Sequence, residues 1–214
     1  MIFTKDFLIR HVFNNTYIMS LDKYLQIANH LDCHYDDETE EFRTSGEWHY
    51  IQFDLSTVGG IIKEIDDIGI LPEKVSACDC GLGLGTIFYY LYLQSKELGK
   101  SFKFTGVEKQ IKYIDFLNRN LLHLWEGNLQ IIHSDLMDCD FSEWNLIWFF
   151  QPFKWAVKAM PFYHKVITEV QSGAIIIGLD AWNIRTYGDE KLILEFNKLE
   201  YYKVGGLQVY RKIN

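Results

Sequence analysis

The sequence has few prolines and few cysteines, 3 and 4 among 214 residues, and it lacks an excess of basic side chains. Its 21 lysines and arginines face 29 aspartates and glutamates, which gives a formal net charge of −8. An acidic surface repels phosphate backbones, so we expect no broad electrostatic binding to bulk nucleic acid. A small-molecule or protein partner stays compatible with this charge.

The cysteines are Cys33, Cys78, Cys80 and Cys139, and their number and spacing do not indicate a disulfide framework. No CxxC pair or Cys/His cluster indicates a metal site, so we expect reduced, mostly buried thiols and no metal. If the run around Cys78 and Cys80 is a strand, we expect alternation to turn these two side chains away from each other.

Long apolar runs are also missing. No stretch approaches the roughly 18 apolar residues that span a bilayer, and Lys5, Asp6 and Arg10 interrupt the apolar residues near the start where a signal peptide would need them. The sequence has no internal repeats and no low-complexity tracts. We therefore expect a cytoplasmic protein with no membrane partner.

What is present is the composition of a globular chain, 48% apolar and long enough for one large domain. Before residue 70 the pattern is helical and irregular, with an apolar stripe that includes Leu21 and Leu25 and a second helix expected over Leu55–Ile68. We divide the chain into a helical extension, residues 1–54, expected to cover the substrate side, and a main domain, residues 55–214.

From Lys74 onward strands and helices alternate, which predicts βαβ units and a parallel sheet. Two glycines, Gly205 and Gly206, then predict a tight antiparallel hairpin between Glu200–Val204 and Leu207–Lys212. The remaining expected strands are Val75–Cys80, Phe102–Glu108, Leu129–His133, Asn145–Phe150 and Gly173–Leu179. The expected helices are Thr86–Leu98, Ile111–Trp125, Trp155–Val170 with a kink or break at Pro161, and Glu190–Lys198.

The first strand runs into a glycine-rich turn, Gly81-Leu-Gly83-Leu-Gly85, and a helix follows. Glycines let the backbone approach a ligand closely, and the first turn of the helix presents free N–H groups to it. Asp79 stands two residues before the turn, and Glu108 ends the second strand, where a carboxylate can accept hydrogen bonds from both hydroxyls of a ribose. Two other interpretations stay open: Asp79 as a cap of the turn, and Glu108 as a solvated residue at a helix start.

Together these motifs resemble those of the class I S-adenosylmethionine-dependent methyltransferases. The resemblance covers about residues 55–214 and implies a three-layer α/β sandwich with strand order 3-2-1-4-5-7-6 and strand 7 antiparallel. It implies S-adenosylmethionine as the cofactor, bound by Asp79, Gly81, Gly83, Gly85 and Glu108. It also places Ser134 and Asp135, which follow the third strand, near the adenine. As an alternative, Asp135 caps the short helix expected near Asp138–Trp144.

After the fourth strand the resemblance implies catalytic residues at Gln151-Pro152-Phe153. Amino-group methyltransferases usually carry Asp or Asn here, followed by two prolines and an aromatic residue, so the motif is altered. It is loosely similar to the Asn-Pro-Phe of histone-lysine methyltransferases of the Dot1 type and their bacterial relatives. The implied function is methyl transfer to an acceptor that the sequence does not identify, an amine on a small molecule or protein being one candidate.

Two rival functions remain. A catalytically silent cofactor-binding regulatory protein fits the altered motif. A nicotinamide-dependent oxidoreductase would need a glycine where the chain has Thr86. A homodimer is compatible with the sequence, which identifies no interface.

Two further groups have open interpretations. Asp180, with Trp182 nearby, follows the fifth strand either as a catalytic residue or as a turn cap. The aromatic cluster of Trp48, His49, Tyr50 and Phe53 forms either a lid over the cofactor or part of the core.

Overall fold

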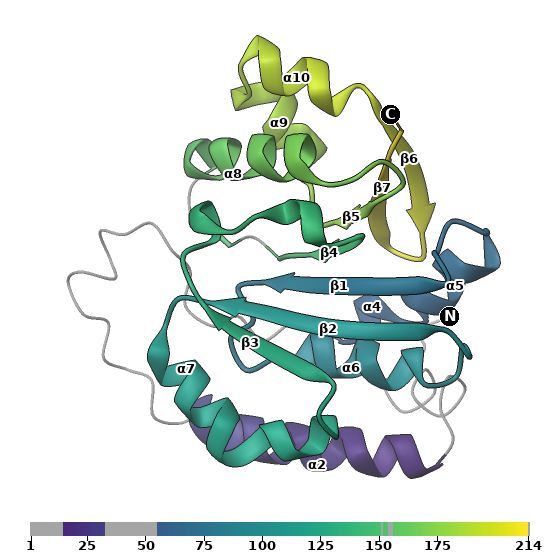
Figure 1. Ribbon diagram of the computed structural model, residues 1–214, viewed down its shortest axis with the longest axis vertical. Helices are drawn as coiled ribbons and strands as arrows, with labels where there is room; N and C mark the ends of the chain where they lie inside the picture. Colours follow the sequence, from purple (N-terminus) through teal and green to yellow (C-terminus); the bar gives the residue numbers. More distant parts are fainter. Residues whose placement is uncertain (1–14, 33–54, 151, 154–155, 214) are drawn as a thin grey trace.

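The computed structural model describes residues 15–32, 55–150, 152–153 and 156–213, which form a single seven-stranded sheet between two layers of helices (Figure 1). The strand order is β3-β2-β1-β4-β5-β7-β6, with β7 antiparallel to both of its neighbours. The predicted fold, strand order and antiparallel strand are therefore confirmed. The strands are β1 (Lys74–Cys80), β2 (Ser101–Glu108), β3 (Leu129–His133), β4 (Leu146–Trp148), β5 (Ile175–Ile177), β6 (Leu199–Val204) and β7 (Leu207–Lys212).

The helices cover both faces of the sheet. One face carries α2 (Asn15–Asp32), α4 (Leu55–Val58), α5 (Ile61–Asp67), α6 (Thr86–Ser95) and α7 (Ile111–Phe116), the last continued by a π turn η1 (Leu117–Leu121) and a 3-10 turn η2 (Leu122–Trp125). The other face carries α8 (Ala156–Glu169), α9 (Ala181–Tyr187) and α10 (Glu190–Phe196). Two short 3-10 turns, η3 (Leu136–Asp138) and η4 (Phe141–Glu143), link β3 to β4.

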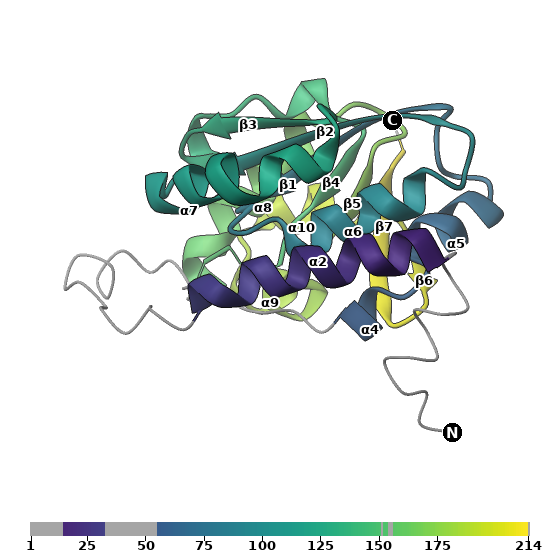
Figure 2. The same ribbon diagram turned by 90° about the horizontal axis from the view of Figure 1, so that it is seen from below.

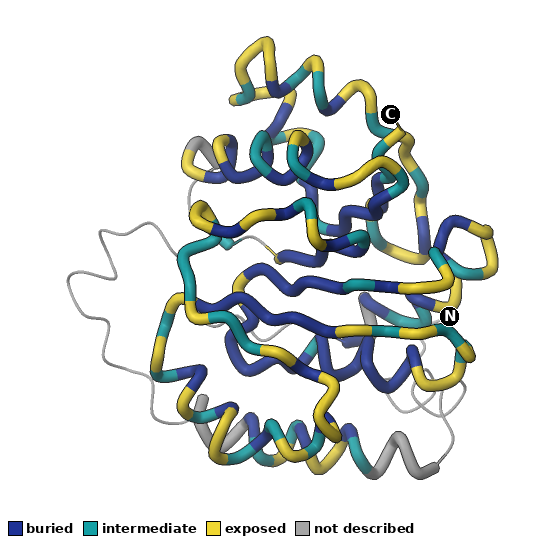
Figure 3. Tube along the Cα trace, viewed as in Figure 1, coloured by how far each residue is buried: buried dark blue, intermediate teal, exposed yellow. Residues whose placement is uncertain are grey.

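The central strand β1 supplies side chains to two separate cores, because successive residues of a strand point to opposite faces. Val75 and Ala77 join the core under α2 and α6, whereas Cys78 and Cys80 join the core under α8. Figure 3 shows β1 and β4 buried through the middle of the molecule. Burial on both faces is what a parallel strand covered by two helical layers requires.

The cysteine pair corrects one prediction. Cys78 and Cys80 lie two residues apart, so they share a face of β1, and their Sγ atoms are 3.9 Å apart. The expectation that alternation separates them was wrong, since it holds for residues one apart. Cys78, Cys80 and Cys139 are free, buried thiols, as expected, and Cys33 lies outside the described residues.

Several helices differ from their predicted lengths. The helix expected over Leu55–Ile68 is divided at Gly59 and Gly60, where Gly59 takes a positive φ of 47°. The helix expected over Ile111–Trp125 changes its hydrogen-bond pattern after Phe116. Helix α8 continues through Pro161 without a break. Helix α9 was not predicted; Asp180 begins it by accepting a hydrogen bond from Asn183 N at 3.0 Å.

Helix α2 lies against the outer side of α6 and beside η1 (Figure 2). Its buried residues Leu21, Tyr24 and Ala28 recur at helical spacing and belong to the same core as α6. No helix in the described part of the chain is both long and apolar enough to cross a bilayer.

Candidate functional site

The glycine-rich loop connects β1 to α6 at the carboxyl edge of the sheet. Gly81, Gly83 and Gly85 have φ angles of 90°, 52° and 66°, values in the left-handed region that favours glycine. The N–H groups of Gly81 and Leu82 donate to the Val107 carbonyl oxygen at 2.9 and 3.0 Å, which ties the loop to β2. A methyl group added at Gly81 would meet no atom within 4 Å, so the loop faces open space there.

Glu108, the last residue of β2, lies directly behind this loop. One carboxylate oxygen accepts the Gly83 N–H at 2.8 Å, and the other accepts the Gln110 N–H at 2.7 Å. The residue is only 6% exposed, which contradicts a solvated residue at a helix start. A carboxylate oxygen can accept more than one hydrogen bond, so these two backbone contacts are compatible with a further donor from a ligand in the loop.

Asp79 is the second buried carboxyl group of the site. It is 6% exposed and pairs in register with Gly106 of β2 and Trp148 of β4. Burial, together with the charge of Glu108, raises the pKa of Asp79 to about 8, and no cationic side chain of the described residues offsets these effects. A positively charged ligand group beside Asp79 would favour its carboxylate form.

The end of β3 meets the turn that follows Glu108. Ser134 N donates to the Glu108 carbonyl oxygen at 3.2 Å, and His133 Nε2 lies 3.0 Å from the Lys109 carbonyl oxygen. Lys109 Nζ forms an ion pair with Asp135 Oδ2 at 3.0 Å. Ser134 and Asp135 are thus adjacent to the end of β2, and their place near the adenine stays a prediction.

Asp135 also caps η3, because its Oδ1 accepts the Met137 N–H at 2.9 Å. The capping interpretation is therefore correct, although the capped turn is Leu136–Asp138 rather than the helix expected near Asp138–Trp144. Partial burial would raise the pKa of Asp135, but the hydrogen bond from Met137 and the Lys109 ammonium hold it below its usual value.

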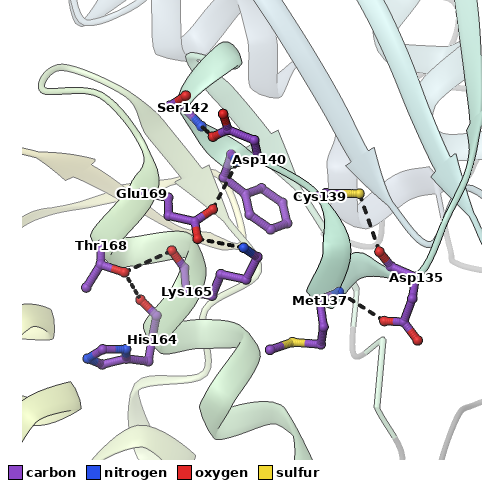
Figure 4. Close-up of polar contacts among 10 residues, drawn as sticks. Asp135, Met137, Cys139, Asp140, Ser142, His164, Lys165, Thr168 and Glu169 are labelled. Carbon is purple, nitrogen blue, oxygen red and sulfur yellow. Dashed lines mark hydrogen bonds and ion pairs between the residues drawn. The ribbon is translucent and has the colours of Figure 1, made fainter.

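The turn that carries Asp135 is anchored to the layer of helices beside it (Figure 4). Cys139 Sγ donates to the Asp135 carbonyl oxygen at 3.5 Å, and Phe141 N donates to Glu169 Oε2 of α8 at 3.2 Å. Lys165 holds the same Glu169 carboxylate at 2.6 Å. These contacts fix the segment between β3 and β4, and with it the position of Asp135.

The predicted catalytic segment follows β4, and Gln151 lies outside the described residues. Pro152 and Phe153 are half-buried, and the Phe153 ring packs on Phe162 of α8 with centroids 5.5 Å apart. Phe150 is 40% exposed at the same end of β4. The structure thus gives Phe153 a packing role, and its place in a reaction pocket remains a prediction.

The remaining predicted candidates are Asp180, Trp182 and an aromatic cluster near residue 50. The Asp180 carboxylate receives hydrogen bonds from Asn183 N at 3.0 Å and Asn183 Nδ2 at 2.7 Å, which is the capping role. Trp182 is 67% exposed on α9. The cluster of Trp48, His49, Tyr50 and Phe53 lies outside the described residues. Among the described residues no group of His, Cys, Asp and Glu side chains could hold a metal ion.

Three residues that shape this site were not predicted from the sequence. Gln110 and Lys109 follow Glu108, and their proximity to it along the chain was the available signal. Gly178 has a φ of 121°, and a methyl group there would overlap the Phe149 carbonyl oxygen. A glycine directly after the Ile175–Ile177 strand was a readable sign of such a close approach between strand ends.

No protein-family model matches the sequence, and a comparison with curated proteins finds no significant match. Solved structures do resemble it. The yhhF protein of Escherichia coli, provisionally named a methyltransferase, has 14% identity and a TM-score of 0.55, over 78% of this chain and 90% of that one. A protein of Pyrococcus horikoshii, provisionally named an RNA methyltransferase, has 13% identity and a TM-score of 0.51, over 83% of this chain and 100% of that one.

A third structure, a mutant of MtNAS in complex with S-adenosylmethionine, has 11% identity and a TM-score of 0.52, over 92% of this chain and 75% of that one. At these identities the likeness concerns the fold. The strand order, the antiparallel β7 and these neighbours agree with each other. The chain therefore has the seven-stranded fold of the class I S-adenosylmethionine-dependent methyltransferases.

Proposed function

We propose that this protein binds S-adenosylmethionine in the glycine-rich loop and transfers its methyl group to a nucleophile. The observation that carries the proposal is the buried Glu108 carboxylate at the end of β2, which accepts the Gly83 N–H of the glycine-rich loop at 2.8 Å. The two neighbours that carry a methyltransferase name support methyl transfer on this fold, and the MtNAS complex supports S-adenosylmethionine as the ligand.

The residues present fit the proposed cofactor. Glu108 would accept hydrogen bonds from the ribose hydroxyls, and the buried Asp79 would pair with the ammonium of the methionine part. Asp135, with Ser134 beside it, would lie at the adenine. Gly81 and Gly83 let the backbone approach the ligand, since their conformations suit glycine. The cofactor supplies a methyl group on a positively charged sulfur, which is already activated for transfer.

The chain itself would supply alignment. An acceptor in line with the methyl group must lie near the end of β4, where Pro152 and Phe153 are half-buried and Phe150 is exposed. Gln151, in the same segment, would accept a hydrogen bond from an amine and direct its lone pair. Positioning of this kind would not require a dedicated general base, because proximity supplies much of the rate.

We propose a small molecule or a protein as the acceptor. The Pyrococcus neighbour is named for RNA, but this chain has a net charge of −8, which disfavours long phosphate backbones. A nicotinamide-dependent oxidoreductase fits less well. The dinucleotide-binding sheet has the strand order 3-2-1-4-5-6, with a parallel sixth strand next to the fifth, whereas in this chain the antiparallel β7 lies next to β5.

Calorimetric titration with S-adenosylmethionine and S-adenosylhomocysteine tests the proposal, with NAD as the control ligand. We expect micromolar binding of the two adenosyl ligands and none of NAD. Failure of both adenosyl ligands to bind would overturn the proposed function.

A catalytically silent cofactor-binding protein is the second candidate, because the Phe153 ring packs into the core beside Phe162. Methyl transfer to any acceptor in a screen of amines and basic proteins would exclude it. Binding without turnover on every acceptor would favour it.

A further inference from the structure

The second half of the glycine-rich loop is held from outside the sheet. Helix α6 begins its own hydrogen bonds at Gly85, whose carbonyl oxygen accepts the Tyr89 N–H at 2.7 Å. The Leu84 carbonyl oxygen lies one residue before that point. It accepts the hydroxyl hydrogen of Tyr24, across 60 positions of sequence, at 2.6 Å.

Tyr24 is fixed in the position that makes this contact. Its side chain is fully buried, and its ring stacks on Tyr89 of α6, with centroids 4.1 Å apart and an interplanar angle of 14°. The ring also meets Trp125 edge-on, with centroids 6.4 Å apart. One turn earlier on α2, Ser20 forms a side-chain hydrogen bond with Tyr89. These contacts leave the hydroxyl of Tyr24 little freedom to move away from the loop.

The last glycine of the loop makes room for Tyr24. A methyl group added at Gly85 would lie 3.1 Å from the Tyr24 hydroxyl oxygen and 3.3 Å from Leu82 Cδ1, both closer than ordinary contact. On the other side of the same loop Glu108 accepts the Gly83 N–H at 2.8 Å. The loop is therefore held at two neighbouring residues, by a carboxylate from β2 and by a hydroxyl from α2.

We propose that Tyr24 is a positioning residue that sets the cofactor loop for ligand binding and makes helix α2 part of the frame of the site. The inference rests on the proposed function, because it assigns the loop to S-adenosylmethionine. Tyr24 acts through the Leu84 carbonyl, so removing its hydroxyl loosens the loop and lowers cofactor affinity while the ring packing stays.

Calorimetric titration of the full chain with S-adenosylhomocysteine tests the effect on binding. We expect Tyr24→Phe to weaken binding by about threefold to tenfold, the range for one lost hydrogen bond. Tyr92→Phe is the matched control, because Tyr92 is a buried tyrosine that stacks on the same Trp125 but donates to Glu126 Oε2, away from the loop. Equal affinities of Tyr24→Phe and the wild type would overturn the proposal.

Hydrogen–deuterium exchange without any ligand provides a second, independent readout. We expect faster exchange of the loop amides between residues 81 and 89 in Tyr24→Phe than in the wild type, and no such change in Tyr92→Phe. Unchanged loop exchange in Tyr24→Phe would overturn the proposal even if affinity fell. If the wild type binds neither adenosyl ligand, the proposed function fails and the cofactor role of Tyr24 fails with it, whereas the exchange result still decides whether Tyr24 holds the loop.

Discussion

Glu108 combines a ligand role predicted from the sequence with a structural role that the fold shows. Its position at the end of the second strand predicts a ribose ligand, and the structure adds that its two oxygens accept the backbone N–H groups of Gly83 and Gln110. Hydrogen bonds of this kind depend on loop conformation, which sequence spacing does not specify. A substitution at this position therefore affects the loop and the ligand together.

Glu108→Gln tests both roles with the smallest change in shape. The amide keeps one acceptor oxygen and replaces the other with a donor, so one backbone N–H loses its acceptor and a ribose hydroxyl loses a charged partner. We expect affinity for S-adenosylhomocysteine to fall by about 1–3 kcal/mol. Glu126→Gln, at an exposed carboxylate, is the control in the same titration. An unchanged affinity of a folded Glu108→Gln protein would refute the ribose assignment.

Asp79 connects the site to the pH dependence of stability. Burial raises its pKa to about 8 in the folded chain, whereas the unfolded value is about 4. Because the folded state binds this proton more tightly, the contribution of Asp79 to the free energy of unfolding falls as pH rises from about 4 to about 8 and is constant above that.

Asp79→Asn removes this pH-dependent loss. We expect the stability of the variant relative to the wild type to rise by several kcal/mol across that window, at about 1.4 kcal/mol per pH unit. Urea denaturation at about pH 5 and about pH 8.5 measures the change. A stability difference that is the same at both values would show that Asp79 is ionised in the folded chain at the lower pH.

At the scale of elements, the sheet was more predictable than the helices. Five apolar runs and a Gly-Gly hairpin predicted the seven strands, because a buried parallel strand has a strong local pattern. Their order in the sheet came from the resemblance to the class I methyltransferases. Helix interruptions were harder to predict: Gly59 breaks one helix by its positive φ, and the π turn after Phe116 has no composition signal. Helix α9 is only seven residues long, and a single Asp180 cap begins it.

The contact between the ends of β4 and β5 also could not be predicted from sequence patterns. Phe149 N donates to the Ile177 carbonyl oxygen at 3.1 Å, and Gly178 passes so close to Phe149 that no side chain fits there. This contact positions the segment that leads to Pro152 and Phe153. It therefore helps to hold the part of the chain where we propose that the acceptor binds.

Gly178→Ala should disrupt this contact. The added methyl group would overlap the Phe149 carbonyl oxygen, and the φ of 121° is unfavourable for alanine. We expect a loss of about 2–4 kcal/mol in the free energy of unfolding, measured by urea denaturation. Gly173→Ala, also at a positive φ but with open space around it, separates the steric effect from backbone strain. Equal losses in the two variants would mean that the close approach to Phe149 carries no cost.

At the scale of the whole molecule, α2 packs as part of the main core. The sequence predicted an amphipathic helix there but not its place, because its contacts, such as Tyr24 with Leu84 and Tyr89, join residues 60 or more positions apart. Leu21, Tyr24 and Ala28 all lie in the core that contains α6. We expect α2 to unfold together with the sheet, and the division at residue 54 to be one of sequence rather than of folding units.

Leu21→Ala tests whether α2 and the sheet unfold together. Its side chain is fully buried, so truncation should lower the free energy of unfolding by about 2–5 kcal/mol in a single transition. Near-ultraviolet and far-ultraviolet circular dichroism in urea should give the same midpoint. Lys23→Ala, at an exposed position on the same helix, should have little effect. An early separate transition in Leu21→Ala would show that α2 unfolds independently of the sheet.

The place of β7 has a consequence for biosynthesis. β7 is the last strand in sequence among the described residues, yet it lies between β5 and β6 in the sheet. The ribosome therefore completes β5, with its three buried isoleucines, before the strand that will pair with its free edge exists. At roughly 5–20 residues per second this interval lasts a few seconds. An unpaired apolar edge is a template for aggregation, so the species most in need of chaperone protection is the nascent chain that lacks its final hairpin.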